Sequence, residues 1–571
     1  MHLDRIVRID MENISVKEEK IKEELFLYSG RALGAYILSK EVDPLCDPLG
    51  KKNKLIFAPG LLGGTIYPCS GRISAISKSP LTGGIKEANS GGTAGNDMAS
   101  LGVRTLILEG LPSEEGTWVV VLNKNGVKLE RADDLKGMRN YECADRLREK
   151  YGKKISIISI GPMGERLKPI ASILVSDPYG HQGRLLARGG LGAVMGSKKI
   201  KAIVIDAEKV KPEVKESDRF SKLARDFSNY LKKAKEGLTL YGTMASVEES
   251  QELGCLPTRN FRSGTFELAD NVSGHHLREV IKERGGKIGI PCMQNCPIRC
   301  SNVYVDQNGN FITSTLQYEV TNQLGPNCGI GDFDKIAPMA QECDDLGMDG
   351  IEVGVTIGVC MEAGIIEFGD ADGAMSLIKE MEKDSLMGKI LTQGAMMTGR
   401  VLGVKRVPVV KGQAMPAYDP RGNKGTGVTY VTSPMGADHT AGNLLPGRKT
   451  ITPGLNLDLH DKKDKAKVSQ ELQLLIVAVD SGGMCYFSGF GPEDVERYAQ
   501  AVRYMYGNNA TYENFISIAK ETLKREWDFN EKAGLTKATD RLPEFFYTEK
   551  LPPYDLVFDV PENEIEQVKN I

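Results

Sequence analysis

The chain has 571 residues, 26% of them charged, with 73 basic side chains against 76 acidic ones. This near balance argues against the strong positive field that would draw a protein to nucleic acid or to an anionic membrane surface, so we expect neither partner. At about 150 residues per domain, the length predicts two to four domains with sizeable cores.

Residues 1–10 alternate apolar and charged side chains, which is typical of a strand and unlike the continuous apolar core of a signal peptide. The apolar runs elsewhere, such as residues 472–479, are much shorter than the roughly 18 residues that a membrane span needs. We therefore expect a cytoplasmic protein without membrane insertion.

Up to about residue 210 the chain is rich in glycine and in short runs of Val, Ile and Leu. These runs predict strands over residues 104–109, 118–122, 155–160 and 201–205. We assign residues 1–210 to a β-rich first domain.

Beyond residue 210 the apolar period lengthens to that of helices. It predicts helices over residues 218–234, 334–346, 350–363 and 374–382, and again over 468–480, 492–506 and 513–531. A stretch punctuated by Gly and Pro, residues 407–454, separates the two groups. We therefore predict an α+β protein whose β-rich domain is followed by mostly helical domains over residues 211–406 and 407–571.

Two glycine-rich stretches of the first domain, residues 70–95 and 183–198, combine glycines with hydroxyl groups and arginines. Backbone N–H groups freed by glycine, together with Arg72 and Lys78, are suited to phosphate. The second stretch ends Gly196-Ser-Lys198, the wrong order for the Gly-Lys-Ser/Thr of a nucleotide-binding loop, so we reject nucleoside triphosphate. Either stretch alone would also fit ordinary turns.

The two helical regions share a repeated Asp-x-x-Gly-Met motif, which follows a predicted helix in each. Its two copies are Asp344-Asp-Leu-Gly-Met-Asp349 and Asp480-Ser-Gly-Gly-Met-Cys485. A carboxylate followed by a glycine suits a planar ligand that carries N–H donors and approaches the backbone closely. Alone, each element would fit a helix C-terminus capped by glycine. The cysteine that ends the second copy favours the ligand interpretation.

Eleven cysteines, an odd number, in a long chain without an export signal favour metal binding over disulfides. Cys292, Cys296 and Cys300 form a close group, and Cys485 is a distant fourth, a common way to supply the four thiolates of an iron–sulfur cubane. The others read as small buried hydrophobic residues without function: Cys46, Cys69, Cys143, Cys255, Cys328, Cys343 and Cys360.

Several motifs resemble the tungsten-containing aldehyde:ferredoxin oxidoreductase family over nearly the whole chain. Beside the cysteine group and the two Asp-x-x-Gly-Met elements, they are Ser79-Pro-Leu-Thr-Gly83, Ala88-Asn-Ser-Gly-Gly92, Arg188-Gly-Gly-Leu-Gly-Ala-Val-Met-Gly-Ser-Lys198 and Ala417-Tyr-Asp-Pro-Arg-Gly422.

The resemblance implies tungsten, or molybdenum, held by two pyranopterins, with a [4Fe-4S] cluster nearby and Mg²⁺ bridging the pterin phosphates. The first domain would form a base under the pterins and the helical domains would close over them. The cofactor-binding residues would be Arg72, Asn89, Ser90, Gly91, Arg184, Leu185, Arg188, Gly189, Asp344, Gly347, Asp349, Asp480 and Gly483. Asp344 and Asp480 would accept from the pterins, and backbone carbonyls of Asn89 and Leu185 would face the Mg²⁺.

By the same resemblance, Glu319 and His439 are the expected catalytic residues. A carboxylate desolvated in a closed site exchanges a proton near neutral pH, and a neutral imidazole donates to a carbonyl oxygen. Glu319 would take a proton from attacking water, and His439 would polarise the aldehyde carbonyl. Without the surrounding motifs, both would read as ordinary surface or loop residues.

The chain departs from the family pattern at two places. Three residues rather than two separate Cys292 from Cys296, so the loop must bulge, and Pro297 disfavours helix there. Pro338 and Gln341 stand where some relatives carry a Glu-x-x-His pair for a bridging iron, so we expect none. A homodimer and a hetero-oligomer both stay open.

The expected activity is oxidation of an aldehyde to a carboxylic acid, with electrons passing to ferredoxin or to an iron–sulfur subunit. Two alternatives remain. One is another low-potential reaction in a multi-subunit complex, either reduction of a carboxylic acid or ring reduction of an aromatic thioester. The other is a non-catalytic protein with a structural zinc on the four cysteines.

Overall fold

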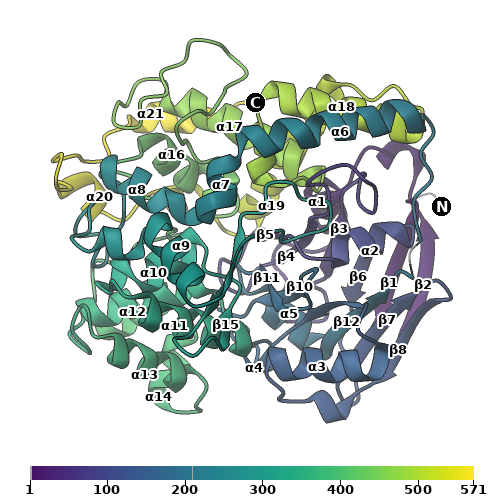
Figure 1. The fold of residues 1–571 in the computed structure, drawn as a ribbon, viewed down its shortest axis with the longest axis horizontal. Helices are drawn as coiled ribbons and strands as arrows, with labels where there is room; N and C mark the ends of the chain where they lie inside the picture. Colours follow the sequence, from purple (N-terminus) through teal and green to yellow (C-terminus); the bar gives the residue numbers. More distant parts are fainter. Residues whose placement is uncertain (1–2, 209) are drawn as a thin grey trace.

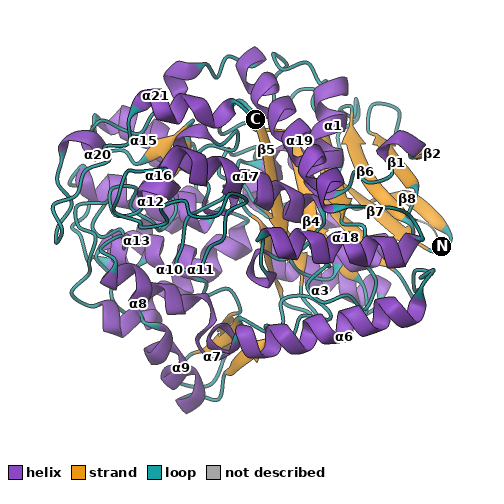
Figure 2. Cartoon of the chain, turned by 90° about the horizontal axis from the view of Figure 1, so that it is seen from above, coloured by secondary structure: helices purple, strands orange, loops and turns teal. Residues whose placement is uncertain are grey.

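A computed structural model describes residues 3–208 and 210–571 of the chain. Strands gather in the N-terminal part, at the right of Figure 1, and helices dominate the rest. The middle helical segment lies at the lower left, and the C-terminal helices run along the top. The same division is visible from above in Figure 2. The α+β class predicted from the sequence is confirmed.

The N-terminal domain contains two six-stranded sheets. In spatial order the first consists of β2 (Ser15–Lys20), β1 (Arg5–Asp10), β6 (Val103–Glu109), β3 (Leu55–Pro59), β4 (Ile73–Lys78) and β5 (Ile85–Ser90). The second consists of β11 (Gln182–Leu186), β10 (Ile173–Ser176), β9 (Ser156–Ser159), β12 (Ile200–Asp206), β7 (Trp118–Asn123) and β8 (Gly126–Arg131).

The two sheets repeat one topology. If β1 to β6 are matched in order to β7 to β12, the strand neighbours are identical. In each sheet the first strand pairs in parallel with the last, and the other pairs are antiparallel. Strands β5 and β11 therefore occupy equivalent edges, and these two edges contact each other. The N-terminal domain is an internal duplication whose halves meet at those edges.

Helices cover the outer faces of the sheets and also fill the space between them. α1 (Gly30–Glu41) and α3 (Asn140–Tyr151) lie outside, whereas α2 (Ala94–Ser100) and α5 (Leu191–Ser197) lie inside. Alternation along β12 shows why the sheet can be buried on both faces: Ile203 and Ile205 enter the inner core, and Ala202 and Val204 pack with α3.

The strands predicted from short apolar runs are confirmed as β6, β7, β9 and β12, and the alternating N-terminus forms β1. The helices of this domain escaped sequence reasoning. α1 is buried over most of its surface and so lacks a polar face. α2 and α5 are short; α2 begins at the end of one glycine-rich stretch, and α5 lies in the other.

The predicted helices of the remaining chain are all present. The middle segment contains α6 (Ser217–Ala234), α7 (Glu236–Tyr241), α8 (Ala245–Glu252), α9 (Gly274–Glu283), α10 (Tyr318–Leu324), α11 (Phe333–Leu346), α12 (Gly350–Glu362), α13 (Ala371–Met381), α14 (Leu386–Leu391) and α15 (Ala395–Leu402). The last segment contains α16 (Lys424–Thr432), α17 (Lys465–Ser481), α18 (Pro492–Tyr506), α19 (Tyr512–Lys532), α20 (Phe545–Thr548) and α21 (Glu562–Ile565).

Short strands interrupt the helical segments. β13 (Lys287–Ile290), β14 (Ser301–Val305) and β15 (Phe311–Thr313) form a small sheet, and β16 (Val409–Val410) pairs with β17 (Gln413–Ala414). One apolar cluster joins Leu61 and Tyr67 of the first domain to Phe220 on α6 and Leu475 on α17. The core thus crosses from one segment to the next, and the boundary proposed at residue 406 stays a prediction.

The C-termini of α11 and α17 abut equivalent glycines of the duplicated domain. Gly60 follows β3 and lies against Gly482 and Gly483, so that a Cβ on Gly60 would approach the Gly482 oxygen to 1.9 Å. Gly161 follows β9, and a Cβ there would come within 2.3 Å of the Leu346 oxygen. Only glycine permits backbones to come this close.

Hydrogen bonds complete both contacts. The Arg72 amide donates to the Gly483 oxygen at 3.1 Å, and the Ser172 amide donates to the Gly347 oxygen at 2.9 Å. Each donor immediately precedes an equivalent strand, β4 or β10. The halves of the first domain therefore each hold one Asp-x-x-Gly element in the same way. None of the helices in the described part of the chain is long and apolar enough to cross a bilayer.

Gly60→Ala tests the close contact. The added methyl group must displace the backbone of Gly482, so we expect the variant to lose about 1–3 kcal/mol of stability, typical of overpacking. Gly237→Ala is the matched control, because a Cβ on Gly237 meets nothing within 4 Å. The midpoints of thermal unfolding at one scan rate compare the two; equal midpoints would contradict the steric interpretation.

Candidate functional site

Asp344 and Asp480 are buried carboxylates at the ends of α11 and α17, each with 5% of its surface exposed. Gly347 and Gly483, three residues later, have positive φ angles of 75° and 64°, where glycine carries no steric cost. The glycine cap that seemed the ordinary explanation is therefore present. It also brings both carboxylates to the face of the duplicated domain.

Asp344 has few partners for a buried acid. Thr315 Oγ1 donates to Asp344 Oδ2 at 2.6 Å, and burial raises the pKa of Asp344 to about 7. The charge of Arg184 opposes that rise. Arg184, on β11, donates to Asp177 at 3.2 Å and to Ser301 Oγ at 3.0 Å, and its Nε is buried without a partner among the described residues. A spare buried donor beside a carboxylate suits a polar, anionic ligand.

Asp480 is held more firmly. Arg31 on α1 donates to Asp480 Oδ2 at 3.3 Å, and Asn89 Nδ2 donates to Oδ1 at 3.2 Å. The Nε and Nη2 atoms of Arg31 donate to the carboxylate of Glu526 on α19, at 2.9 and 2.8 Å. Burial and the charge of Glu87 raise the pKa of Asp480 well above its usual value. Arg72 donates to the Asn89 oxygen at 2.8 Å and so lies beside the same group.

The predicted phosphate-facing residues occupy equivalent edges. Asn89 and Ser90 end β5, whereas Leu185 lies in β11. Gly91 follows β5, and a Cβ there would lie 3.0 Å from the sulfur of Cys292. The edge strands thus place the predicted Mg²⁺-facing carbonyls at the junction of the halves and the first cysteine directly beside β5.

Arg188 differs from the other two arginines. It donates to Asp349 Oδ2 at 3.2 Å and to the carbonyl oxygens of Ala437 and Ala414 at 2.7 and 2.6 Å. Asp349 also caps α12. The Arg188 guanidinium thus ties the first domain to both helical segments. Neighbouring Gly189, with φ of 81°, lies against the buried side chain of Lys86. The cofactor binding expected of Arg188 and Gly189 stays a prediction.

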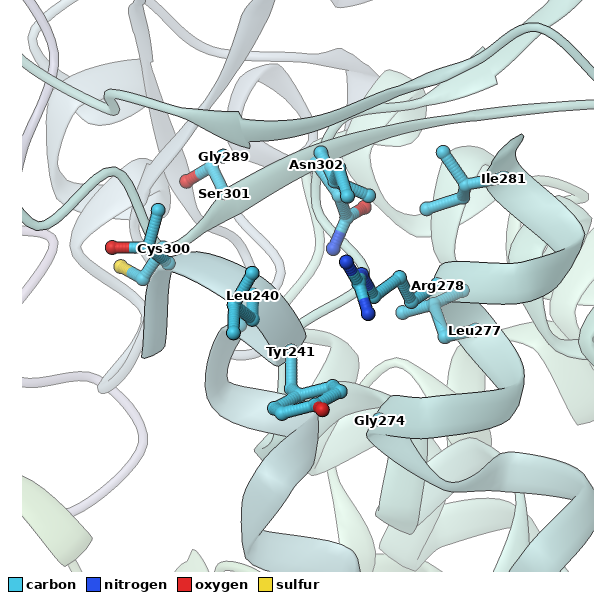
Figure 3. Close-up of a pocket in the computed structure, with 13 residues that line it drawn as sticks. Leu240, Tyr241, Gly274, Leu277, Arg278, Ile281, Gly289, Cys300, Ser301 and Asn302 are labelled. Carbon is cyan, nitrogen blue, oxygen red and sulfur yellow. The ribbon is translucent and has the colours of Figure 1, made fainter. Parts of the chain in front are cut away.

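The four predicted cysteine ligands come together. Cys292, Cys296 and Cys300 lie between β13 and β14, and Cys485 lies just after α17. The thiols of Cys292, Cys296 and Cys485 all act to raise the pKa of Cys300, which burial raises most. In Figure 3 the Cys300 sulfur points away from Arg278 and from the pocket that this arginine lines. Three buried thiols and the partly exposed thiol of Cys292 offer the four sulfur donors that a cubane needs.

The extra residue before Cys296 is taken up in a tight turn. Asn295 has φ of 57°, a left-handed conformation that asparagine adopts more readily than most residues. Its side chain donates to the Thr65 oxygen at 3.1 Å, and the Gly92 amide donates to the Cys292 oxygen at 2.9 Å. The bulge is therefore anchored to the first domain on both sides.

Sequence reasoning missed Cys69. It lies in the first domain, three residues before Arg72, yet its sulfur is 3.9 Å from that of Cys296. The thiols of Cys296, Cys485 and Cys292 all raise its pKa. Proximity to the Ser70-Gly71-Arg72 motif was the available signal, but an isolated buried cysteine gave no reason to use it.

Glu319 and His439 also meet. Glu319 lies in the first turn of α10 and is 9% exposed. Its Oε1 lies 3.9 Å from His439 Nε2, and its Oε2 accepts from the Ala417 amide at 2.6 Å. Burial raises the pKa of Glu319, and the proximity of His439 partly offsets this. The pair thus joins the middle segment to the last one, and both side chains remain partly accessible to solvent.

A buried charge network supports His439. Asp438 precedes it, accepts from the Thr440 amide at 3.0 Å and pairs with the ammonium group of Lys86. Lys86 and Arg188 hold the pKa of Asp438 well below its usual range against the effect of burial. His439 Nδ1 is buried without a hydrogen-bond partner among the described residues. The histidine thus keeps Nε2 toward Glu319 on a loop fixed by Lys86.

The pKa of Asp344 predicts a pH-dependent stability in the cofactor-free chain. Because the pKa rises on folding from 3.8 to about 7, the folded chain binds more protons between these values, and stability falls as pH rises through them. Asp344→Asn removes that cost, so we expect the variant to be more stable than the parent at pH 8, by on the order of 1–4 kcal/mol, and similar at pH 4.

Denaturant unfolding of both proteins from pH 4 to 8 measures this difference. Asp134→Asn, at an exposed position, is the control and should leave the pH profile of the parent unchanged. A constant difference between Asp344→Asn and the parent at every pH would contradict the prediction.

Comparison with known proteins accounts for this arrangement. Models of the aldehyde ferredoxin oxidoreductase N-terminal domain and of its domains 2 and 3 match residues 6–207 and 222–567. Tungsten-containing aldehyde ferredoxin oxidoreductases of Pyrococcus abyssi and Thermococcus kodakarensis are each 34% identical, over 96% of this chain and 92% of theirs.

More distant relatives are named for other activities. The WOR-like subunit of an aliphatic sulfonate oxidoreductase from Pyrococcus furiosus is 27% identical over 78% of this chain and 76% of its own. The active-site complex BamBC of benzoyl coenzyme A reductase, solved with 1,5-dienoyl-CoA, shares the fold with a TM-score of 0.82 at 18% identity, covering 99% of this chain and 93% of that one. The nearly full-length matches show that this chain belongs to the tungsten-containing aldehyde ferredoxin oxidoreductase family of oxidoreductases.

Proposed function

We propose that the protein oxidises aldehydes to carboxylic acids with water at a tungsten or molybdenum bis-pyranopterin centre. The electrons would leave through a [4Fe-4S] cluster to ferredoxin or a ferredoxin-like subunit. The observation that carries the proposal is the Glu319–His439 pair, 3.9 Å apart and contributed by different segments. The names of the relatives that are 34% identical support the same reaction.

The residues that would hold the two pterins are those already arranged in equivalent pairs. Asp480 with Asn89 and Arg72 would bind one, and Asp344 with Arg184 would bind the other. Carboxylates accept from N–H donors and guanidinium groups pair with phosphate, so each set offers both halves of the recognition that such a ligand needs. Mg²⁺, which prefers oxygen ligands, would lie at the junction of β5 and β11.

Bound there, the metal centre would supply a two-electron acceptor for the aldehyde, and the cubane would supply one-electron steps to a carrier. The overall change is RCHO + H₂O to RCOOH with two protons and two electrons released. Glu319 is the base of this scheme: burial favours its neutral form, and so it takes a proton from water more readily than an exposed carboxylate. His439 Nε2 donates to the carbonyl oxygen and favours attack at the carbonyl carbon.

The loop that carries the cysteines marks the exit for electrons. Gln294 and Asn295 are exposed and line a depression of about 1070 Å³, bordered also by Ile66 and by Lys153 and Lys154 of the first domain. Cys292 is the only one of the four predicted ligands that is not fully buried in the described structure. A carrier seated in this depression would approach the cluster through that loop.

The WOR-like subunit and the benzoyl-CoA reductase complex favour a second candidate, because they place the same family and fold in assemblies with other reactions. In that case the chain would reduce a carboxylic acid or the ring of an aromatic thioester together with partner subunits.

Metal analysis and an activity assay of the anaerobically purified chain test the proposal. We expect one tungsten or molybdenum and about four irons per chain, and reduction of a viologen with simple aldehydes. The same metals with activity only after co-expression of partner subunits would favour the second candidate. Zinc as the bound metal would contradict both and leave the non-catalytic alternative.

Glu319→Gln isolates the proposed base. The amide can still accept from the Ala417 N–H but cannot take a proton, so we expect kcat to fall by at least about 10²-fold with tungsten and iron contents unchanged. Glu342→Gln is the control, because the partner of Glu342 is Arg139 rather than His439. Turnover at the parental rate in Glu319→Gln would mean that another group takes the proton.

A further inference from the structure

Cys69 is a fifth cysteine at the predicted cluster site. It is fully buried, and its thiol donates to Cys296 Sγ at 3.9 Å. Its carbonyl oxygen accepts from the Cys485 amide at 2.8 Å. Cys69 is thus bonded to two of the four predicted ligands, one through its side chain and one through its backbone.

The backbone at Cys69 is unusual for a residue with a side chain. Its φ of 61° lies in the left-handed region, which L-residues other than Asn and Asp seldom occupy. Glycine would relieve this strain, as it does at Gly64 and Gly83 of the same region. A cysteine in such a conformation points to a use of the thiol, since strained residues gather at functional sites.

The sulfur of Cys296 accepts the hydrogen bond in this pair, as a thiolate ligand would, and Cys69 is the donor. Cys69 also belongs to the first domain, outside the loop that contains Cys292, Cys296 and Cys300.

We propose that Cys69 is a positioning residue of the cluster: its thiol donates a hydrogen bond to the ligand Cys296 and makes the cluster easier to reduce. The proposal rests on the cubane of the proposed function. Hydrogen bonds to the sulfurs are among the features that set the potentials of such clusters. A donor to a thiolate stabilises the extra negative charge of the reduced state, so the potential rises.

Three substitutions at residue 69 distinguish loss of the thiol donor from an effect on folding. Cys69→Ala removes the donor. Cys69→Gly removes it too and also relieves the positive φ, which guards against a variant that fails to fold. Cys69→Ser retains a hydroxyl donor. Cys360→Ala, at a fully buried cysteine of α12, is the matched control for loss of a core thiol.

Two quantities are measured on the anaerobically purified full chain: its iron content and the midpoint potential of the cluster. The potential is obtained from a redox titration in which electron paramagnetic resonance detects the reduced cluster. We expect every variant to keep about four irons per chain. The potential should be lower in Cys69→Ala and Cys69→Gly, shifted back toward the parent in Cys69→Ser, and unchanged in Cys360→Ala.

Two results would overturn the proposal. One is a parental potential in both Cys69→Ala and Cys69→Gly. The other is loss of iron from these variants while Cys296→Ala keeps four irons, which would make Cys69 itself a ligand. A parent chain without any cluster would instead refute the proposed function, and iron analysis of the parent distinguishes that failure from the other two.

Discussion

The close approach of two helix ends to the N-terminal domain is the constraint on which the site depends. Gly60 and Gly161 let the backbones of α17 and α11 come so near that even one methyl group would collide. The amides of Arg72 and Ser172 then fix both ends by hydrogen bonds. Since the carboxylates, the fourth cysteine and Arg72 lie within a few residues of these contacts, their mutual positions follow from backbone packing rather than from flexible side chains.

The duplication explains why the site has two halves and also where they differ. Equivalent strands present equivalent edges, and each edge faces one carboxylate. Only Asp480, however, is bound by an arginine that is itself clamped by a buried glutamate, whereas Asp344 relies on a threonine hydroxyl. A paired buried charge resists displacement more than one held by a neutral donor. Two identical ligands would therefore meet unequal surroundings, one carboxylate held by a charged arginine and the other by a neutral hydroxyl group.

Periodicity and motif spacing were enough to predict the α+β class, the principal strands and helices, and the family. Long amphipathic helices such as α6 and α19, and apolar strands such as β6, can be recognised from the pattern of apolar residues within a short stretch of sequence. The duplication was invisible, because its halves share strand order rather than residues, and α1 is too buried to show a polar face. The position of Cys69 depends on a contact 227 residues away in the chain, which no local pattern reports.

Burial of so much charge has a cost that the fold alone does not recover. Asp344, Asp480, Arg184 and Lys86 are all almost inaccessible, and transfer of an ionised group from water is unfavourable unless partners satisfy it. Lys86 is satisfied by Asp438, but Arg184 retains a buried donor without a partner and Asp344 has a pKa near neutrality. Such groups are what an anionic ligand with N–H donors would complete. A ligand that binds only the folded chain would stabilise the folded state. Ligand binding would thereby offset the cost of burying these incompletely paired groups.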